Sequence, residues 1–579
     1  MYKISRKGFA YNNNNIRRVV LGVLAVAAAL ASLIVLYKIT GADSSSYDKK
    51  YIIDDGWTVE FDDKTYSGIT LSSFKFPHGM NRGDRVTLYN KLPDNIEFRL
   101  PVLKMQTYSS AINVYCGGEL IYSYGSDLFE KGAFVGNGYH YADISQAQGD
   151  TIKIELTATE YNSFSSVEDI VLTGYSNVFR QMIVGGRVPF AVSVFLILFG
   201  IVVTGISGWI IIKKPELSML LWIGVLSLAI GTWTSCNYRF AQMFNVSLST
   251  ASTLEYASML VGQIAALMYF MNYVRRTNSK MQQRVFMIFT GAVCVFSAAV
   301  FLLHITDVVH MPSVLPAIHA VIAAESVYII YLIVLIIRSG STSSKLLFIG
   351  FCVLICFVFF EIISYMLKIY ADIYIMDRTG ASAVGTMAFV VFMLLNFSVD
   401  MLHRLREANE KEIYYKMAHT DALTKLANRR YCERVMNELS QRDEQYGIYS
   451  FDLNDLKYIN DNLGHGCGDD LIHGFAEILT ETFQTDGVVG RMGGDEFIAI
   501  VSSGPDFNYK NFIAKMNDIM ARENSREKRF QYKVSCGYAD SSEVSASGGH
   551  VDSHEIYALA DDRMYVCKRE SKEKNREKR

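Results

Sequence analysis

The chain has 579 residues, which is more than one ordinary domain holds, and its formal net charge is only −2. A balance this close to neutral does not favour binding to nucleic acid, and we expect no such partner. The nine cysteines are scattered singly, without the paired spacing of a zinc site. Residues 186–402 contain long apolar runs whereas residues 403–579 are rich in charge, so the sequence predicts a membrane part followed by an aqueous part.

The chain is predicted to begin with a cytoplasmic N-terminus, residues 1–17, followed by a transmembrane helix over residues 18–39. The apolar run from Val19 to Tyr37 is about as long as a bilayer core requires, and Arg17 and Arg18 precede it. A cleaved signal peptide is the alternative interpretation. The run is long for a signal peptide and lacks a clean small-residue cleavage site, which favours an uncleaved anchor.

Residues 40–185 predict an all-β domain outside the cytoplasm. Apolar and polar residues alternate over residues 85–89, 95–100, 111–115 and 151–156, as they do in half-buried strands. Glycine and proline turn signals separate these segments, which favours a β-sandwich of the jelly-roll kind. Aromatic residues of this region could stack on a sugar or pack in the core, namely Trp57, Tyr108, Tyr122, Tyr124, Tyr139 and Tyr141.

Residues 186–402 predict seven further transmembrane helices. The apolar segments cover residues 187–212, 217–236, 251–274, 284–304, 314–338, 345–368 and 380–402. Lysine and arginine gather in alternate connections, which places the N-terminus and residues 403–579 in the cytoplasm and residues 40–185 outside. The sequence therefore predicts a protein of the cell membrane with eight spans.

Two carboxylates, Glu325 and Glu361, fall inside predicted spans. An ionisable group is costly within a bilayer, so such residues suggest a functional role. A protonated or hydrogen-bonded residue of the helix bundle is the alternative, and both interpretations stay open.

Residues 403–420 predict a helical signalling linker between the last span and the C-terminal domain. A loose three-four spacing relates Met401, Leu405, Ala408, Glu412 and Tyr415. Such a helix could transmit rotation or separation between two subunits, or it could be a rigid spacer.

The C-terminal part contains five motifs in order. They are DALTKLANRRY at 421–431, YSFDLNDLKYINDNLGHGCGD at 449–469, VVGRMGGDEFIAIV at 488–501, VSCGYA at 534–539 and LADDRMYVCK at 559–568. A predicted strand ends at Asp452, whose carboxylate suits a hard cation such as Mg²⁺. The Gly-Gly pair between apolar runs predicts a β-hairpin that brings Asp495 and Glu496 opposite Asp452.

These motifs resemble, in order and spacing, the GGDEF family of diguanylate cyclases over residues 421–572. The resemblance implies an α/β domain whose central sheet contains antiparallel strands and is flanked by helices, followed by a charged tail at 573–579. The implied reaction condenses two GTP into cyclic di-GMP and two diphosphates. Because each domain would hold one GTP, the resemblance also implies a homodimer through this domain and the linker helix.

The resemblance further implies a role for each matched residue. Implied ligands of Mg²⁺ or Mn²⁺, two ions per active site, are Asp452, the carbonyl of Leu453, Asp495 and Glu496. Implied catalytic groups are Asp495 as proton acceptor, with Lys457 and Arg491 on the phosphates. Implied substrate contacts come from Asn460, His465, Asp469, Gly493, Gly494 and Lys568.

Asp469 favours guanine for a chemical reason, because a carboxylate can accept from both N1–H and the exocyclic amine of guanine. Adenine lacks that pair of donors.

Two positions depart from the family pattern, since Lys425 and Ala427 stand where the family usually has Gly and Pro. Both positions shape the backbone, and no reactive group is lost.

Two other functions compete with a cyclase. A degenerate GGDEF domain would bind nucleotide and signal by protein contact, although Asp452, Asp495 and Glu496 are all present. A sugar-binding or transport protein with an accessory output is the third possibility, supported by the outer domain alone. The order of β-domain, seven spans and output also resembles bacterial seven-transmembrane receptors, in which the outer domain is similar to carbohydrate-binding domains. An unknown external ligand, with carbohydrate as one class, is therefore expected.

Overall fold

The computed structural model describes residues 50–146, 149–212, 218–275, 279–338, 342–371, 380–441, 445–484, 487–502, 508–527, 529–544 and 552–577. The described residues divide into two compact units, the first ending at Met401 and the second beginning at Leu402. The predicted N-terminus, residues 1–17, and the predicted first span, residues 18–39, lie outside the described residues.

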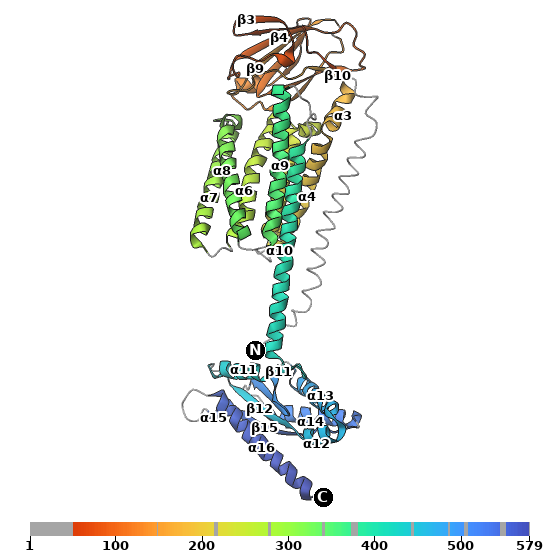
Figure 1. Ribbon diagram of the computed structural model, residues 1–579, viewed down its shortest axis with the longest axis vertical. Helices are drawn as coiled ribbons and strands as arrows, with labels where there is room; N and C mark the ends of the chain where they lie inside the picture. The colour runs from red at the N-terminus through yellow and green to blue at the C-terminus, as the bar shows by residue number, and fades with distance from the viewer. Residues whose placement is uncertain are drawn as a thin grey trace. The chain divides into compact units, whose positions relative to one another are not determined.

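The first unit begins with two antiparallel sheets (Figure 1). The larger has the order β3-β2-β4-β9-β6-β7 and the smaller has the order β1-β10-β5-β8. Alternate residues of both sheets enter one core, among them Leu88 and Ile154 from the larger sheet and Leu103 from the smaller. The strands are β1 (Tyr51–Ile52), β2 (Trp57–Phe61), β3 (Lys64–Ile69), β4 (Arg85–Lys91), β5 (Pro101–Tyr108), β6 (Ser110–Cys116), β7 (Glu119–Tyr124), β8 (Asn137–Asp143), β9 (Thr151–Ala158) and β10 (Val171–Gly174).

The strands predicted over residues 85–89, 111–115 and 151–156 are confirmed as parts of β4, β6 and β9, but the strand predicted over residues 95–100 is wrong. Those six residues are all described and contain no strand, and the next strand begins at Pro101. Ile96 is buried in the core and Phe98 packs against it, whereas Leu100 is 55% exposed. An irregular segment that packs on a core can thus produce the same alternation as a strand.

Long helices follow the sheets, and the predicted apolar ranges fall on them. They are α4 (Arg187–Ile211), α5 (Ser218–Asn237), α6 (Leu248–Val274), α7 (Lys280–Ile305), α8 (Met311–Arg338), α9 (Thr342–Ala371) and α10 (Ala381–His419). In the described part of the chain, six helices are long and apolar enough to cross a membrane, namely all of these except α9. The apolar stretch recognised within α9 is the shorter Lys345–Phe357, and the side chain of Glu361 lies outside the described residues. Six such helices indicate a membrane protein.

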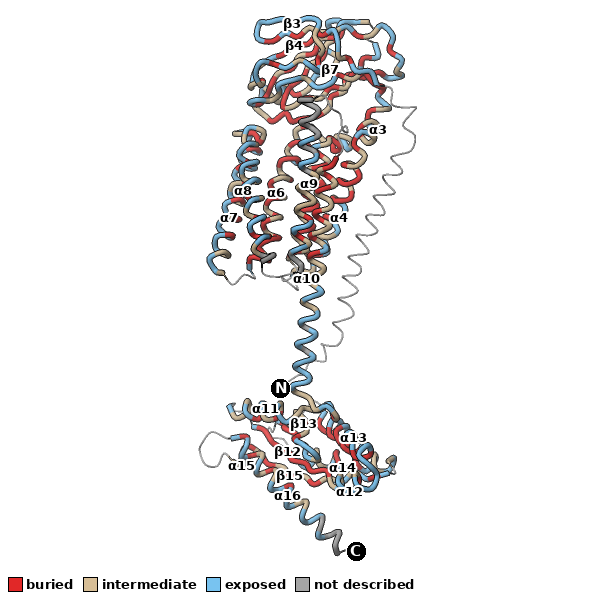
Figure 2. Tube along the Cα trace, in the orientation of Figure 1, coloured by how far each residue is buried: buried red, intermediate tan, exposed pale blue. Residues whose placement is uncertain are grey.

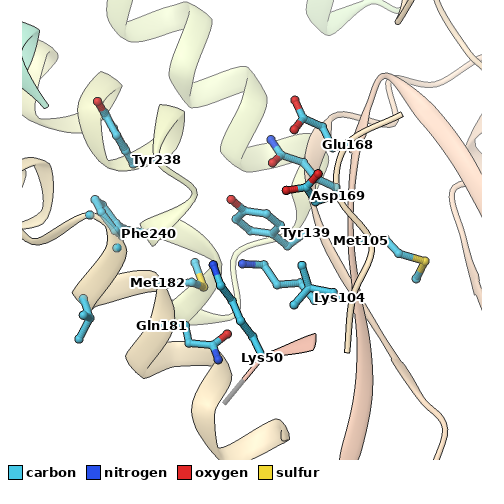
Figure 3. A pocket seen from close by; sticks show the side chains of 15 residues that line it. Lys50, Lys104, Met105, Tyr139, Glu168, Asp169, Gln181, Met182, Tyr238 and Phe240 are labelled. Atoms are coloured by element: carbon cyan, nitrogen blue, oxygen red, sulfur yellow. The ribbon is translucent and has the colours of Figure 1, made fainter. Parts of the chain in front are cut away.

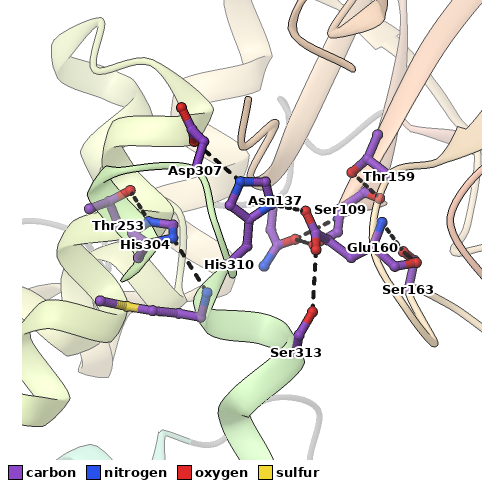
Figure 4. A network of polar contacts seen from close by, with 11 residues as sticks. Ser109, Asn137, Thr159, Glu160, Ser163, Thr253, His304, Asp307, His310 and Ser313 are labelled. Atoms are coloured by element: carbon purple, nitrogen blue, oxygen red, sulfur yellow. Dashed lines mark hydrogen bonds and ion pairs between the residues drawn. The ribbon is translucent and has the colours of Figure 1, made fainter. Parts of the chain in front are cut away.

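The sheets and the helices of this unit meet through a buried polar network (Figure 4). Nδ1 of His310 pairs with the carboxylate of Glu160, and its Nε2 lies 3.2 Å from Oδ1 of Asp307. The side chains of His310 and Glu160 are only 3% and 5% exposed. Nearby, the backbone N–H of Asn137 in β8 donates to Oγ of Ser252 in α6 at 2.8 Å. Specific polar contacts therefore join the β-rich region to the helices.

The helix α10 contains 39 residues and runs without interruption from an apolar half into an exposed half (Figure 2). The predicted linker, residues 403–420, forms the end of this helix up to His419. The rings of Tyr415 and His419 stack with centroids 4.2 Å apart, and Arg434 donates to the Tyr415 hydroxyl at 3.1 Å. The end of α10 is thereby attached to α11 (Arg429–Ser440).

The second unit has a five-stranded sheet in the order β11-β13-β14-β12-β15. Only β11 and β13 run parallel, and the other neighbours are antiparallel. One face packs on α12, α13 and α14, and the other packs on α11 and α16, so the central strand β12 is buried throughout (Figure 2). The remaining elements are β11 (Ala427–Asn428), β12 (Tyr446–Leu453), α12 (Leu456–Leu463), α13 (His465–Phe483), β13 (Gly487–Gly493), β14 (Glu496–Ser502), α14 (Tyr509–Arg526), β15 (Val534–Asp540), α15 (Ser541–Val544) and α16 (Ser553–Glu577).

Candidate active site

Asp452 lies at the end of the central strand β12 and is 6% exposed. Its neighbours Phe451 and Leu453 enter the core against α13, and their burial fixes the strand end. One carboxylate oxygen of Asp452 accepts from Nζ of Lys568 in α16 at 2.5 Å. The other oxygen, Oδ1, is buried without a hydrogen-bond partner in the described structure. A buried carboxylate oxygen left in this state is unfavourable unless a cation joins it.

The predicted hairpin is confirmed, because β13 and β14 pair up to Gly493 opposite Glu496 and leave Gly494 and Asp495 as the turn. Gly494 has φ +50°, a left-handed conformation that glycine adopts without strain. A Cβ added to Gly494 would meet nothing within 4 Å, so the surface above the turn is open. The open turn gives a substrate close access to the backbone.

The carboxylates of the turn lie beside the end of β12, as the sequence predicts. Glu496 is the register partner of Asp452, and the N–H of Leu453 donates to the carbonyl oxygen of Asp495 at 2.9 Å. Burial raises the pKa of Glu496 above its ordinary value, and the nearby charges of Asp561, Asp495 and Asp452 raise it further. Negative charge is therefore concentrated at this end of the sheet.

Asp561 is an acidic neighbour that the sequence reasoning did not assign to the site. It belongs to α16, and its Oδ1 accepts from Oγ of Ser450 at 3.0 Å. The signal was available in the last motif, which contains Asp561 three residues before the buried Met564. Only the packing of α16 on β12 reveals that this carboxylate approaches Glu496.

The residues present fit a divalent cation, although no group of three or more His, Cys, Asp or Glu side chains is gathered as a ready ligand set in the described ranges. A positive charge would stabilise the unpartnered Oδ1 of Asp452 and would reduce the repulsion between Glu496 and the carboxylates around it. Carboxylate oxygens suit Mg²⁺ or Mn²⁺, which keep water or substrate oxygens in their coordination shell.

Arg491 stabilises the turn instead of lying free beside it. Its Nε and Nη2 donate to the carbonyl of Gly494 at 3.1 and 2.8 Å, and its Nη1 pairs with Asp421 at 3.2 Å. Burial would raise the pKa of Asp421, but hydrogen bonds from Thr424 and Arg491 outweigh this effect and lower the pKa. In this state Arg491 positions the hairpin, and a phosphate contact would require it to share or exchange these bonds.

The predicted base-reading residues come together where α12 meets α13. A Cβ on Gly468 would lie 1.9 Å from Oδ1 of Asn460, so only glycine permits this close approach next to Asp469. The side chain of Asp469 is exposed, and Lys457 and His465 are exposed on the same pair of helices. These residues share one motif with Asp452 but are carried by α12 and α13, whereas the carboxylates are carried by β12 and the hairpin. Lys568 differs from the rest, because it is paired with Asp452 and not directed to an open surface.

Comparison with known proteins agrees with this geometry. Residues 418–574 match the family described as diguanylate cyclase, GGDEF domain. This part of the chain is a GGDEF domain. The family match begins at the end of α10 and ends near the end of α16, so the GGDEF domain includes all the motifs of the candidate site.

Two curated relatives and one solved structure illustrate the similarity. Signaling protein YkoW of Bacillus subtilis (strain 168) is 33% identical over 180 residues, which are 29% of this chain and 21% of YkoW. Diguanylate cyclase DgcS of Shewanella oneidensis is 29% identical over 174 residues, which are 29% of this chain and 55% of DgcS. The coiled coil and GGDEF domain of DgcB from Caulobacter crescentus, solved in complex with c-di-GMP, is 26% identical and covers 30% of this chain and 92% of that chain, with a TM-score of 0.26. The chain therefore matches about half or less of the length of these curated relatives.

Proposed function

We propose that this chain is a membrane-bound diguanylate cyclase that condenses two GTP into cyclic di-GMP and two diphosphates. The observation that carries the proposal is the buried, unpartnered Oδ1 of Asp452 beside the turn carboxylates of a GGDEF domain. Relatives named as diguanylate cyclases support the same reaction. A domain that only bound nucleotide would not need to keep this costly cluster of carboxylates.

Asp452, the carbonyl of Leu453, Asp495 and Glu496 would hold the metal ions, two per site. Bound Mg²⁺ or Mn²⁺ neutralises phosphate charge and lowers the pKa of the attacking 3′-hydroxyl. The open Gly493-Gly494 turn admits the ribose and α-phosphate, and Asp495 accepts the proton of the 3′-hydroxyl at its carboxylate. The O3′ oxygen then bonds to the α-phosphorus of the second GTP, and the bond from that phosphorus to diphosphate breaks. The O3′ oxygen of the second GTP reacts in the same way with the α-phosphorus of the first, which closes the ring and releases the second diphosphate.

The remaining predicted residues would bind and orient GTP. Asn460 and Asp469 recognise the guanine edge, with His465 beside them, and Lys457 meets phosphate. Lys568 pairs with Asp452 in this structure, and with a metal on Asp452 its ammonium group would be free to bind the triphosphate. Arg491 holds the Gly494 carbonyl and keeps the hairpin in place. Because one domain holds one GTP, two copies must face each other, and the continuous helix α10 is suited to bring them together.

We assign residues 186–402 to seven spans, with an eighth at 18–39, which makes residues 40–185 extracytoplasmic and the GGDEF domain cytoplasmic. The six apolar helices and the lysine and arginine bias of the sequence support this arrangement. The two sheets around one core support a sandwich of the jelly-roll kind. Domain boundaries at 421–572 for the cyclase and 573–579 for a charged tail are consistent with the family match.

A cavity of about 450 Å³ in the first unit is the site we propose for the external signal (Figure 3). Its lining includes Lys104, Tyr139, Glu168, Asp169 and Gln181, which come from the β-rich region and from α3 (Tyr175–Gly185). The Nζ of Lys104 lies 4.1 Å from the centre of the Tyr139 ring. A lining with both signs of charge and an aromatic ring suits a sugar or a zwitterion.

This cavity can be tested by thermal unfolding of the full-length protein in nanodiscs with a panel of monosaccharides and amino acids. A ligand of the cavity is expected to raise the melting temperature of the wild type and not that of Tyr139→Ala. If every stabilising compound acts equally on both proteins, the signal does not bind here.

Trp57, by contrast, is fully buried and donates to the Ile53 carbonyl at 2.9 Å, so this aromatic residue belongs to the core.

The cyclase proposal is tested by incubating the full-length protein in nanodiscs with GTP and Mg²⁺ and separating the products by chromatography. We expect cyclic di-GMP from the wild type and none above background from Asp495→Ala. GTP binding without product by the folded wild-type dimer would favour the degenerate, contact-signalling alternative.

A further inference from the structure

A second cavity, of about 370 Å³, lies among the membrane helices of the first unit. Five helices contribute to its walls: α5, α6, α8, α9 and α10. Most of the lining is apolar and includes Trp233, Phe270, Phe351 and Phe389. Aromatic walls of this kind are typical of sites for small apolar molecules.

Two polar side chains line this apolar cavity without partners. Glu325 in α8 is 4% exposed, and its Oε2 makes no hydrogen bond within the described structure. Gln263 in α6 is 7% exposed, and neither its Nε2 nor its Oε1 has a partner there. Leaving such atoms unsatisfied in an apolar environment is costly, which is why buried polar groups normally have partners.

A buried carboxylate of α6, Glu255, shows the contrast. Glu255 is 8% exposed, and its Oε2 accepts from Nη1 of Arg239 at 2.7 Å. The fold therefore satisfies Glu255 internally but leaves Glu325 with an unpartnered acceptor in the wall of a cavity large enough for a ligand. A carboxylate accepts hydrogen bonds, whereas a carboxamide can both donate and accept.

We propose that this cavity binds a bilayer-soluble molecule with an apolar, aromatic-compatible body and a donor head, either an amine or a hydroxyl. Oε2 of Glu325 accepts from the head, and the Gln263 amide takes the remaining hydrogen bond. The walls include Thr386, Phe389 and Met393 of α10, the helix that continues to His419. A ligand here contacts the helix that leads to the GGDEF domain, so the site is suited to regulate it from within the membrane.

The test uses the full-length protein in nanodiscs and three probes that share one body: 4-phenylbutylamine, 4-phenylbutan-1-ol and butylbenzene. Affinities are measured by titration calorimetry in the absence of GTP, so the result does not depend on the proposed cyclase activity. We expect the amine and the alcohol to bind the wild type at least about tenfold more tightly than butylbenzene, since a hydrogen bond to a charged or buried partner has that effect.

The isosteric variant Glu325→Gln is expected to lose about tenfold in affinity for the amine and to bind butylbenzene as the wild type does. Thr290→Val is the matched control, because Thr290 Oγ1 is also buried without a partner in the described bundle but does not line the cavity. It should retain the wild-type preference. Equal affinity of the wild type for all three probes, absence of binding, or an unchanged preference in Glu325→Gln would overturn the proposal.

Discussion

Asp469 and Asp470 are adjacent residues of α13 with the same charge and different surroundings. Asp470 pairs with Arg529 at 2.8 Å, whereas Asp469 adjoins the Asn460–Gly468 contact and is exposed. If Asp469 accepts from guanine, its replacement by alanine removes a charge-assisted hydrogen bond. We expect Asp469→Ala to raise the KM for GTP by about tenfold to a hundredfold.

Asp470→Ala is the control for this measurement, since its exposed ion pair contributes little. Steady-state rates of cyclic di-GMP formation over a range of GTP concentrations give both constants. A KM that rises equally in both variants would remove Asp469 from base recognition.

Lys425 illustrates a departure from the family pattern that has a structural cost. Its φ is +60°, a left-handed conformation that costs a non-glycine residue about 1–2 kcal/mol. Glycine would avoid this strain but would lose more chain entropy on folding, so Lys425→Gly should stabilise the domain by about 0.5–1 kcal/mol. Thermal unfolding of the full-length protein measures the change. A melting temperature at or below that of the wild type would show that the bond from Nζ of Lys425 to the Ala422 carbonyl outweighs the strain.

The sequence predicts some residues of the candidate site but not the contacts that they make. The matched motifs name Asp452, Asp495 and Glu496, and the strand register brings them together as expected. They do not predict that Lys568 pairs with Asp452 or that Arg491 holds the Gly494 carbonyl, because these contacts depend on how α16 and the hairpin pack. The position of Asp561 near Glu496 was not predicted for the same reason.

At the scale of elements, the His310–Glu160 pair joins the segment that follows β9 to the residue that precedes α8. The hydrogen bond that His310 donates to Glu160 raises the pKa of His310 despite its burial, and Asp307 adds to the increase. Glu160, Asp307 and His304 are the titratable groups that lie nearest to His310. Because the folded pKa is raised, the stabilisation is complete below the unfolded value near 6.5 and is lost as pH rises through the folded value.

We therefore expect the melting temperature of the wild type to fall between about pH 6 and pH 9 more steeply than that of His310→Gln. Thermal unfolding of both full-length proteins in nanodiscs, across that range, measures the difference in slope. The comparison of slopes removes any constant loss of stability in the variant. Parallel curves would mean that the ion pair does not stabilise this contact.

Elements of different kinds were predictable to different degrees. Long apolar runs indicate clearly where a helix lies, so the helices from α4 to α8 begin and end within a few residues of their predicted ranges. Short alternating segments are ambiguous, as residues 95–100 show, because Ile96 and Phe98 reach the core without forming a strand. Pairing partners decide that outcome, and they are distant in sequence.

For the whole molecule, the sequence indicated an outer β-region, membrane helices and a C-terminal catalytic fold in that order. The described structure contains the sheets, the apolar helices and the C-terminal domain in this order, and the family match covers the C-terminal domain. Neither cavity could be predicted, since Tyr139 and Gln181 in one, and Gln263 and Glu325 in the other, converge only through tertiary packing. The two proposed ligand sites therefore depend on the fold, whereas the proposed chemistry can be read from the motifs.

We propose that Asp452 and the hairpin carboxylates hold the metal required for condensation of GTP. Mn²⁺ binding, followed by electron paramagnetic resonance, and cyclic di-GMP formation can be measured in the same full-length samples with GTP. Asp452→Asn is expected to lose both Mn²⁺ binding and product formation, while Asp470→Asn keeps both. Undiminished product formation by a folded Asp452→Asn protein would contradict the proposal.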